Sequence, residues 1–185
     1  MFGQCYCFKH LSRDYFIKVR FVAQLMKAVA VVGMGYVGIP VAACFANSGL
    51  NVFGIDIDEK KIEKINQGKY PIDGEEPGIE ELIEKVVSND KLKATTEYSE
   101  AADVDAWVVC VQTPFNVEKF EPNQKALRGA MKSIGSNMKK GCLVVVESTI
   151  PPGTVEEVVQ PILETESGMT AGTDFSLGHC PERVK

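Results

Sequence analysis

The sequence contains no long apolar segment, no basic tract and no low-complexity region. No apolar run approaches the roughly 18 residues that a membrane-spanning helix needs, so no such helix is expected. No basic run is longer than a pair of lysines, and the net charge of the chain is -5. Proteins that bind nucleic acid usually carry a basic patch or stripe. Neither a nucleic acid nor a membrane is therefore expected as a partner.

The cysteines form no motif that would bind a metal. Cys5 and Cys7 have no second pair of Cys or His at the spacing of a zinc site, so no metal is expected. The remaining cysteines lie within or beside apolar patterns that predict strands and helices. This is typical of reduced, packed thiols in a cytoplasmic protein. These residues are Cys44, Cys110, Cys142 and Cys180.

Residues 1–25 differ from the rest of the chain. Charged side chains interrupt this segment, and it lacks the apolar central region of a signal peptide. We interpret it as a leader or arm of unknown role, with Met26 as the natural start. Residues 26–185 are predicted to form one domain, which at this length can bury a core without a disulfide or a metal.

Strand and helix patterns alternate from Lys27 onward. Continuous apolar runs such as "AVAVV" are typical of strands that are buried on both faces of a parallel sheet. About six such strands are predicted, which favours an α/β fold of Rossmann type, with a doubly wound, mostly parallel sheet in three layers. Helices are predicted over 37–48, 58–67 and 123–140, and others begin at 77 and after 153.

Two of these helices carry an apolar stripe. Apolar residues recur at i, i+3, i+4 and i+7, the pattern of a helix that buries one face, and we assign both stripes to core packing. In the last helix, Thr154 and Glu157 are expected to form a capping box. The stripes consist of Ile79, Leu82, Ile83, Val86 and Val87, and of Val155, Val158, Val159, Ile162 and Leu163.

The segment "VVGMGYVG" predicts a dinucleotide-binding turn. Gly33, Gly35 and Gly38 follow an apolar strand and open a helix, as in the GxGxxG fingerprint. In that fingerprint Gly33 permits the tight turn, Gly35 lets the backbone approach the pyrophosphate, and Gly38 lets the helix pack close to the strand. The N–H groups at the start of the helix then bind the phosphates. A glycine turn without a ligand is the alternative.

Asp56 lies at the end of the next strand, 18 residues after Gly38, where the fingerprint has its ribose-binding carboxylate. Such a carboxylate accepts hydrogen bonds from the ribose hydroxyls. It repels the 2′-phosphate of NADP by about 4 kcal/mol per unit charge at roughly 4 Å, with an effective dielectric near 20. No arginine follows Asp56. The sequence therefore predicts NAD rather than NADP, and only Lys60 and Lys61 leave NADP open.

Polar residues follow three further predicted strands. Thr113, Thr149 and Glu182 each come after a different strand, close to a proline. In an open α/β sheet the carboxyl ends of the strands meet at the ligand-binding edge. Either threonine alone is as well explained by a turn as by a site. The three strand ends together favour a functional site beside the dinucleotide.

Four motifs resemble the N-terminal domain of the UDP-glucose/GDP-mannose dehydrogenase family. They are "VVGMGYVGIP", "VQTPF…EP", "VVVESTIPPGT" and "CPERV", and they occur in the family's order. The resemblance spans nearly all of residues 26–185. The last motif is similar to the UDP-N-acetylmannosamine dehydrogenase branch, since the UDP-glucose branch tends to carry Pro-Glu-Phe there. Gln112 departs from the family, which usually has proline before the Thr-Pro pair.

The resemblance implies NAD-dependent oxidation of a nucleotide sugar. The C6 alcohol of a UDP-sugar, best matched by UDP-N-acetylmannosamine, passes through an aldehyde and a cysteine thioester to a uronic acid, with a second NAD consumed after the first. Thr149 and Glu182 are implied to hold or activate water at the reacting carbon, because a hydroxyl positions water and a carboxylate accepts its proton. The residues implied to line NAD are Tyr36, Val37, Asp56, Thr113 and Thr149.

The family's nucleophilic cysteine has no match in this chain. In the family it lies in a later Gly-rich segment, and none of the cysteines here has that context. The family's central dimer-forming helix and C-terminal UDP-sugar-binding domain also lie beyond Lys185. We therefore expect a fragment that is inactive alone, from an enzyme that is a homo-oligomer at full length. The alternatives are a UDP-glucose 6-dehydrogenase fragment, a hydroxyacid or 6-phosphogluconate type of dehydrogenase, and a non-catalytic NAD-sensing module.

Overall fold

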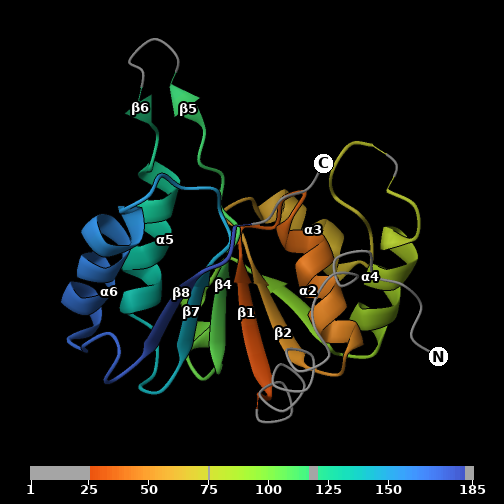
Figure 1. Ribbon diagram of the computed structural model, residues 1–185. Coiled ribbons are helices and arrows are strands. Elements are labelled where there is room, and N and C mark those ends of the chain that lie inside the picture. Colours follow the sequence, from red (N-terminus) through yellow and green to blue (C-terminus); the bar gives the residue numbers. More distant parts are fainter. Residues whose placement is uncertain (1–25, 75, 117–120, 182–185) are drawn as a thin grey trace, which may run out of the picture.

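The computed structural model describes residues 26–74, 76–116 and 121–181 (Figure 1). Strands and helices alternate along the chain. The strands of the main sheet are β1 (Ala28–Val32), β2 (Asn51–Ile55), β3 (Leu92–Thr95), β4 (Ala106–Val109), β7 (Leu143–Val146) and β8 (Ser176–His179). The helices are α2 (Gly38–Asn47), α3 (Glu59–Asn66), α4 (Ile79–Ser88), α5 (Lys125–Gly135) and α6 (Gln160–Ser167), with a 3-10 helix at Tyr98–Ala101 and a π-helix at Val155–Val159.

The main sheet has six strands in the order β3-β2-β1-β4-β7-β8, and every neighbouring pair is parallel. This confirms the predicted Rossmann-type fold. β1 lies in the centre, where Val29 pairs with Val52 of β2 on one side and with Ala106 of β4 on the other. The strand order reverses at this point, so the loops after β1 and β4 diverge. In open α/β sheets ligands bind at such a switch point.

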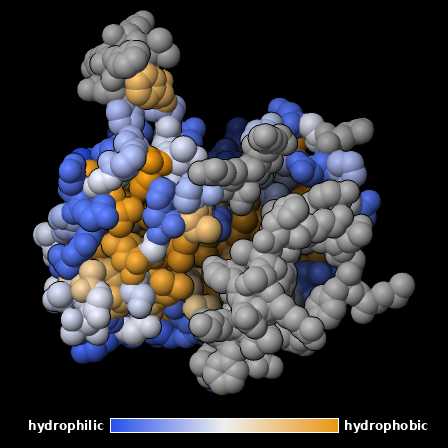
Figure 2. All heavy atoms as spheres, in the orientation of Figure 1, coloured by the Kyte–Doolittle hydropathy of each residue, from blue (hydrophilic) through white to orange (hydrophobic). Residues whose placement is uncertain are grey.

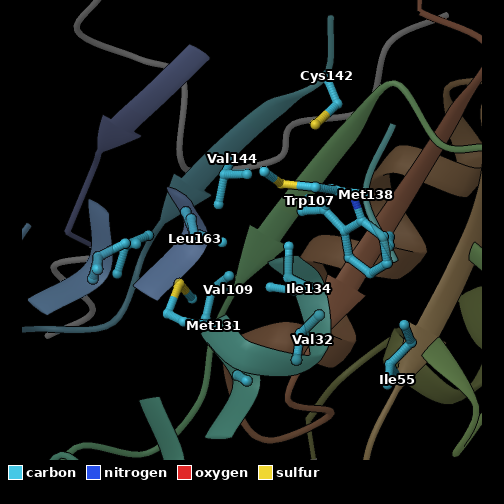
Figure 3. Close-up of a cluster of buried hydrophobic side chains, with 14 of the residues drawn as sticks. Val32, Ile55, Trp107, Val109, Met131, Ile134, Met138, Cys142, Val144 and Leu163 are labelled. Carbon is cyan, nitrogen blue, oxygen red and sulfur yellow. The ribbon is translucent and has the colours of Figure 1, made fainter. Parts of the chain in front are cut away.

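Helices cover both faces of the sheet, which gives the predicted three layers. α2, α3 and α4 lie on one face, and α5 and α6 lie on the other (Figure 1). Side chains of β1 alternate between the two cores: Val31 packs beneath α2 and α4, whereas Val32 packs beneath α5 and α6. Figure 3 shows the second core, in which Trp107 and Leu163 are fully buried. Burial of each such side chain stabilises the fold by about 1.5–3 kcal/mol.

Both predicted apolar stripes are confirmed. Ile83 of α4 and Leu163 of α6 are fully buried, and the other stripe residues are buried or packed against a core. β3 and β8 are the edge strands of the sheet. Figure 2 shows apolar residues gathered on the surface between α6 and β8.

The predicted capping box of Thr154 and Glu157 is wrong. Thr154 is buried and its side chain makes no capping hydrogen bond. The helix begins instead with π-type hydrogen bonding, in which the N–H of Gln160 donates to the carbonyl of Val155, five residues back. Pro161 explains this start, because it lacks an N–H and its ring crowds the carbonyl four residues before it.

The helix predicted over 123–140 is also shorter than expected. α5 ends at Gly135, and polar side chains bond to carbonyl groups of its last turn. The hydroxyl of Ser136 donates to the carbonyl of Lys132, and the amide of Asn137 donates to the carbonyl of Ser133. Such local bonds compete with helix continuation.

A small hairpin was not predicted. β5 (Phe115–Asn116) and β6 (Glu121–Pro122) pair antiparallel and stand above the carboxyl edge of the main sheet (Figure 1). Strands this short carry no alternation of apolar and polar residues that a sequence pattern would reveal.

Candidate functional site

The turn between β1 and α2 is shaped by its glycines. Gly33 has a φ of +94°, which favours glycine, and a Cβ there would lie 2.8 Å from the carbonyl oxygen of Cys110. A Cβ at Gly38 would lie 1.9 Å from the carbonyl oxygen of Gly33, so only glycine lets α2 start this close to β1. A Cβ at Gly35 would meet nothing within 4 Å, so the backbone there is open to a ligand. This geometry fits a bound pyrophosphate.

Met34, between the first two glycines, fixes the turn to β2. Its side chain is fully buried and crosses Gly54, where a Cβ would lie 2.7 Å from the methionine methyl carbon. The N–H of Met34 donates to Asp56 Oδ2 at 2.8 Å. The N–H of Gly33 donates to the carbonyl of Ile55 at 2.7 Å. The glycine turn and the carboxylate of Asp56 are therefore held as one unit.

Asp56 lies at the carboxyl end of β2, and its side chain is only 11% exposed. Oδ1 accepts a hydrogen bond from the N–H of Asp58 at 3.0 Å, and Oδ2 forms an ion pair with Lys61 Nζ at 3.0 Å. The backbone N–H groups of Lys60 and Lys61 both donate to the capping side chain of Asp58. Of the two lysines that the sequence left open, Lys61 is the one whose ammonium group pairs with Asp56. Its charge offsets part of the repulsion between Asp56 and a 2′-phosphate.

Two large apolar side chains are exposed beside this carboxylate. Ile57 follows Asp56 directly and is 93% exposed, and Tyr36 of the glycine turn is 67% exposed. The hydroxyl of Tyr36 donates to the carbonyl of Asp73 at 3.3 Å. Ligand sites are largely lined by apolar side chains, and Ile57 is suited to cover one face of an adenine ring. Sequence analysis missed Ile57, because an isoleucine directly after a strand reads as part of the strand's apolar run.

Tyr98, on the 3-10 helix, adds no charge to this region. Its ring stacks on buried Trp107 with the ring centres 6.1 Å apart. Burial, together with the negative charge of Asp56, raises the pKa of Tyr98 to about 12. The phenol is therefore neutral at physiological pH.

The ends of β4, β7 and β8 are joined by hydrogen bonds. Thr113 Oγ1 donates to the carbonyl of Thr149 at 2.7 Å. Ser148, which is buried, donates to the carbonyl of Val111 at 2.6 Å. His179 Nε2 lies 3.3 Å from the carbonyl oxygen of Ser148. Ser148 was not singled out in the sequence, because a buried hydroxyl in a loop has no sequence signature of its own.

The residues assigned to the cofactor from the sequence lie at the carboxyl edge of the parallel strands. Glu182 lies outside the described residues. Within the part of the chain that the structure describes, no cluster of His, Cys, Asp and Glu side chains is arranged to hold a metal ion. In that same part, no helix has the length and apolar character needed to cross a bilayer. The residues at the edge are Gly33, Gly35, Tyr36, Val37, Gly38, Asp56, Thr113 and Thr149.

Residues 27–185 match the NAD binding domain of the UDP-glucose/GDP-mannose dehydrogenase family. The chain belongs to this family. Its cofactor is NAD, and members of the family are NAD-dependent nucleotide-sugar dehydrogenases. The glycine turn and Asp56 are therefore the expected features of a domain in this family.

Similar proteins act on different nucleotide sugars. The UDP-N-acetyl-D-mannosamine dehydrogenase of Pyrococcus horikoshii is 40% identical over 156 residues, covering 84% of this chain and 36% of that protein. The GDP-mannose 6-dehydrogenase of Pseudomonas savastanoi pv. phaseolicola is 40% identical over 161 residues, covering 85% of this chain and 36% of that protein. The crystal structure of NDP-N-acetyl-D-galactosaminuronic acid dehydrogenase from Methanosarcina mazei Go1 matches with a TM-score of 0.82 and 44% identity, covering 91% of this chain and 38% of that chain. This chain thus spans little more than a third of the length of these relatives.

Proposed function

We propose that this chain is the NAD-binding part of a nucleotide-sugar 6-dehydrogenase that oxidises a UDP-sugar to its uronic acid. The observation that carries the proposal is the hydrogen bond from Met34 to Asp56, which joins the phosphate-binding turn to the ribose-binding carboxylate in a chain of this family. The overall reaction converts the C6 alcohol and a water into a carboxylate, while two NAD molecules each accept one hydride. Bound NAD supplies the hydride acceptor, and the chain's own residues bind and orient it.

In this proposal, different residues of the site bind the adenosine, the pyrophosphate and the nicotinamide of NAD. Asp56 and Lys61 hold the ribose hydroxyls of the adenosine, and Ile57 covers the adenine. The open backbone at Gly35 and the first turn of α2 hold the pyrophosphate. Thr113 and Thr149 lie at the nicotinamide end, where the hydrogen bond from the Thr113 hydroxyl to the Thr149 carbonyl joins the two loops.

We also propose that Thr149 and Glu182 hold and activate the water that enters in the second half of the reaction. In a full-length enzyme, Glu182→Gln is expected to slow this water-dependent half more than the first hydride transfer. Single-turnover measurements of NADH formation with the alcohol and with the aldehyde separate the two halves. Equal slowing of both halves would contradict the assignment.

UDP-N-acetylmannosamine is the substrate that we propose, because "CPERV" is similar to that branch. UDP-glucose is the alternative substrate. The chain alone is proposed to be inactive, since it has no cysteine in the family's nucleophile context. The full-length enzyme is proposed to be a cytoplasmic homo-oligomer. A non-catalytic NAD-binding module is the remaining alternative. If a full-length version oxidised no nucleotide sugar, the proposal of an enzyme would be wrong and this alternative would stand.

The test of the proposal is a calorimetric titration of NAD, and of NADP in parallel, into this chain. NAD binding with clearly weaker NADP binding is expected, because Asp56 accepts from ribose hydroxyls and repels a phosphate. If neither NAD nor NADP bound, the proposal would be contradicted for this chain.

A further inference from the structure

An open surface cavity of about 620 Å³ lies between α5 and Pro122 of the β5–β6 hairpin. It contains none of the residues assigned above to NAD or to the reacting carbon. It is open to solvent rather than enclosed. The lining residues are Pro122, Gln124, Lys125, Arg128, Gly129 and Lys132.

Three cations line this cavity, and no carboxylate is among its described lining residues. Lys125, Arg128 and Lys132 are spaced at i, i+3 and i+7, so they project from the same side of α5. None of them takes part in an ion pair with the residues that the structure describes. Gln124 Oε1 accepts from Arg128 Nη2 at 3.3 Å, which steadies the guanidinium. A chain with a net charge of -5 thus gathers three positive charges on one side of α5, none of them in an ion pair with a described carboxylate.

Gly129 lies among these cations and has no packing role. Glycine destabilises a helix interior, so its presence there requires a reason. Gly135 of the same helix has one, because a Cβ there would lie 2.7 Å from the Cβ of Glu166 in α6. A Cβ at Gly129 would meet nothing within 4 Å. The missing side chain keeps the cavity floor open between Lys125 and Lys132.

The neighbouring cavity of about 330 Å³ limits where an anion can bind. Arg128 and Lys132 line both cavities, but Glu157 and Glu166 line the second one. Their negative charges disfavour an anion on the α6 side. The favourable position is therefore the hollow between Lys125 and Arg128, over Gly129.

We propose that this cavity binds a small phosphate-bearing anion, such as a pyrophosphate group. A guanidinium matches phosphate oxygens with two parallel hydrogen bonds, and the lysines add point charges on either side. The open backbone at Gly129 lets the anion sit close to α5. This site is separate from the glycine turn and does not depend on the dehydrogenase proposal.

The experiment titrates inorganic pyrophosphate into the ¹⁵N-labelled chain saturated with NAD, so that the glycine turn is filled. The amide signals of α5 are expected to shift. The combined variant Lys125→Gln, Arg128→Gln, Lys132→Gln is expected to raise the pyrophosphate Kd about tenfold or more, since each charged hydrogen bond contributes strongly. Unchanged α5 signals, or an unchanged Kd in this variant, would overturn the proposal. A titration with ADP tests whether the bound anion is part of a nucleotide. If ADP binds more tightly than pyrophosphate and shifts the same α5 signals, the site binds a nucleotide; if both bind equally, it recognises the phosphates alone.

Gly129→Gln distinguishes a binding site from a merely basic helix. Glutamine fills the hollow without changing its charge, so it is expected to weaken pyrophosphate binding while raising Tm by roughly 2 °C, because glycine is removed from a helix interior. The matched control is Lys85→Gln with Lys91→Gln, which removes two lysines that bond to Asn47 and Asn51 elsewhere on the chain. This control is expected to leave the pyrophosphate Kd unchanged. Equal weakening by Gly129→Gln and by the control would show only general attraction to positive charge.

Discussion

Asp56 connects the two halves of the dinucleotide site. Its carboxylate accepts from the N–H of Met34 and from the N–H of Asp58, and it pairs with Lys61. These donors hold the carboxylate in one orientation before the cofactor arrives, which lowers the cost of ordering it on binding. About one lone pair is left for a ribose hydroxyl, because a carboxylate accepts about four hydrogen bonds and these donors take three.

Asp56→Ala is expected to raise the Kd for NAD about 10–100-fold, since it removes hydrogen bonds to a charged group. The Kd for NADP should rise less, because the repulsion of the 2′-phosphate disappears as well. Calorimetric titration of both nucleotides gives the selectivity ratio. Lys61→Met should shift this ratio further against NADP, whereas Lys60→Met is the control and should leave it unchanged. An unaltered ratio in Asp56→Ala would remove this residue from the ribose.

The pairing of α5 with α6 rests on a close approach at Gly135. The missing side chain lets the backbone of α5 contact Leu163 and Glu166 of α6. The sequence predicted both helices, and in α6 the apolar stripe repeats at the helical period. It did not predict this contact, since the spacing of apolar residues does not say which glycine faces a neighbouring helix.

Gly135→Ala is expected to lower the free energy of unfolding by about 1–2 kcal/mol. The added Cβ would overlap Glu166 and press on the carbonyl of Leu163. Such overpacking destabilises the fold by more than the higher helix propensity of alanine stabilises it. The measurement is the urea midpoint at constant m-value. Gly129→Ala is the matched control on the same helix, and it should raise the midpoint because nothing opposes its Cβ. A raised midpoint in both variants would show that α6 simply moves away.

Across the whole molecule, the sequence predicted where the site would lie better than which side chains would form it. Parallel strands bring their carboxyl ends to one edge, so the gathering of Gly35, Asp56 and Thr113 follows from the fold class alone. The roles of Lys61 and Ser148 depend on side chains that cross from one element to the next. Such contacts are set by packing and rotamers, which a single sequence does not display.

The opposite edge of the sheet is held by a different carboxylate. Asp105, just before β4, accepts from the N–H groups of Lys27 and Ala28 at the start of β1, and pairs with Lys139 after α5. Burial raises the pKa of Asp105, but the bonds from Lys27, Lys139 and Ala28 outweigh it, so the pKa is lowered. The ionised carboxylate therefore holds the start of β1 and the segment after α5 close to the start of β4.

Stability at acid pH should depend on this carboxylate. Its pKa is lower in the folded chain than the value of about 3.9 expected when unfolded, so its contribution is present above roughly pH 4 and lost as the pH falls below that. Asp105→Asn should therefore lower Tm at pH 7 and have a smaller effect at pH 3. The fluorescence of Trp107, the chain's single tryptophan and fully buried, reports unfolding at each pH. Asp174→Asn is the control: its carboxylate pairs with Lys140, whose side chain is 75% exposed, and accepts from the N–H of Thr170 rather than from a strand, so its effect on Tm at pH 7 should be smaller. If Asp105→Asn lowered Tm equally at pH 7 and pH 3, the charge of Asp105 would play no part in holding β1 to β4.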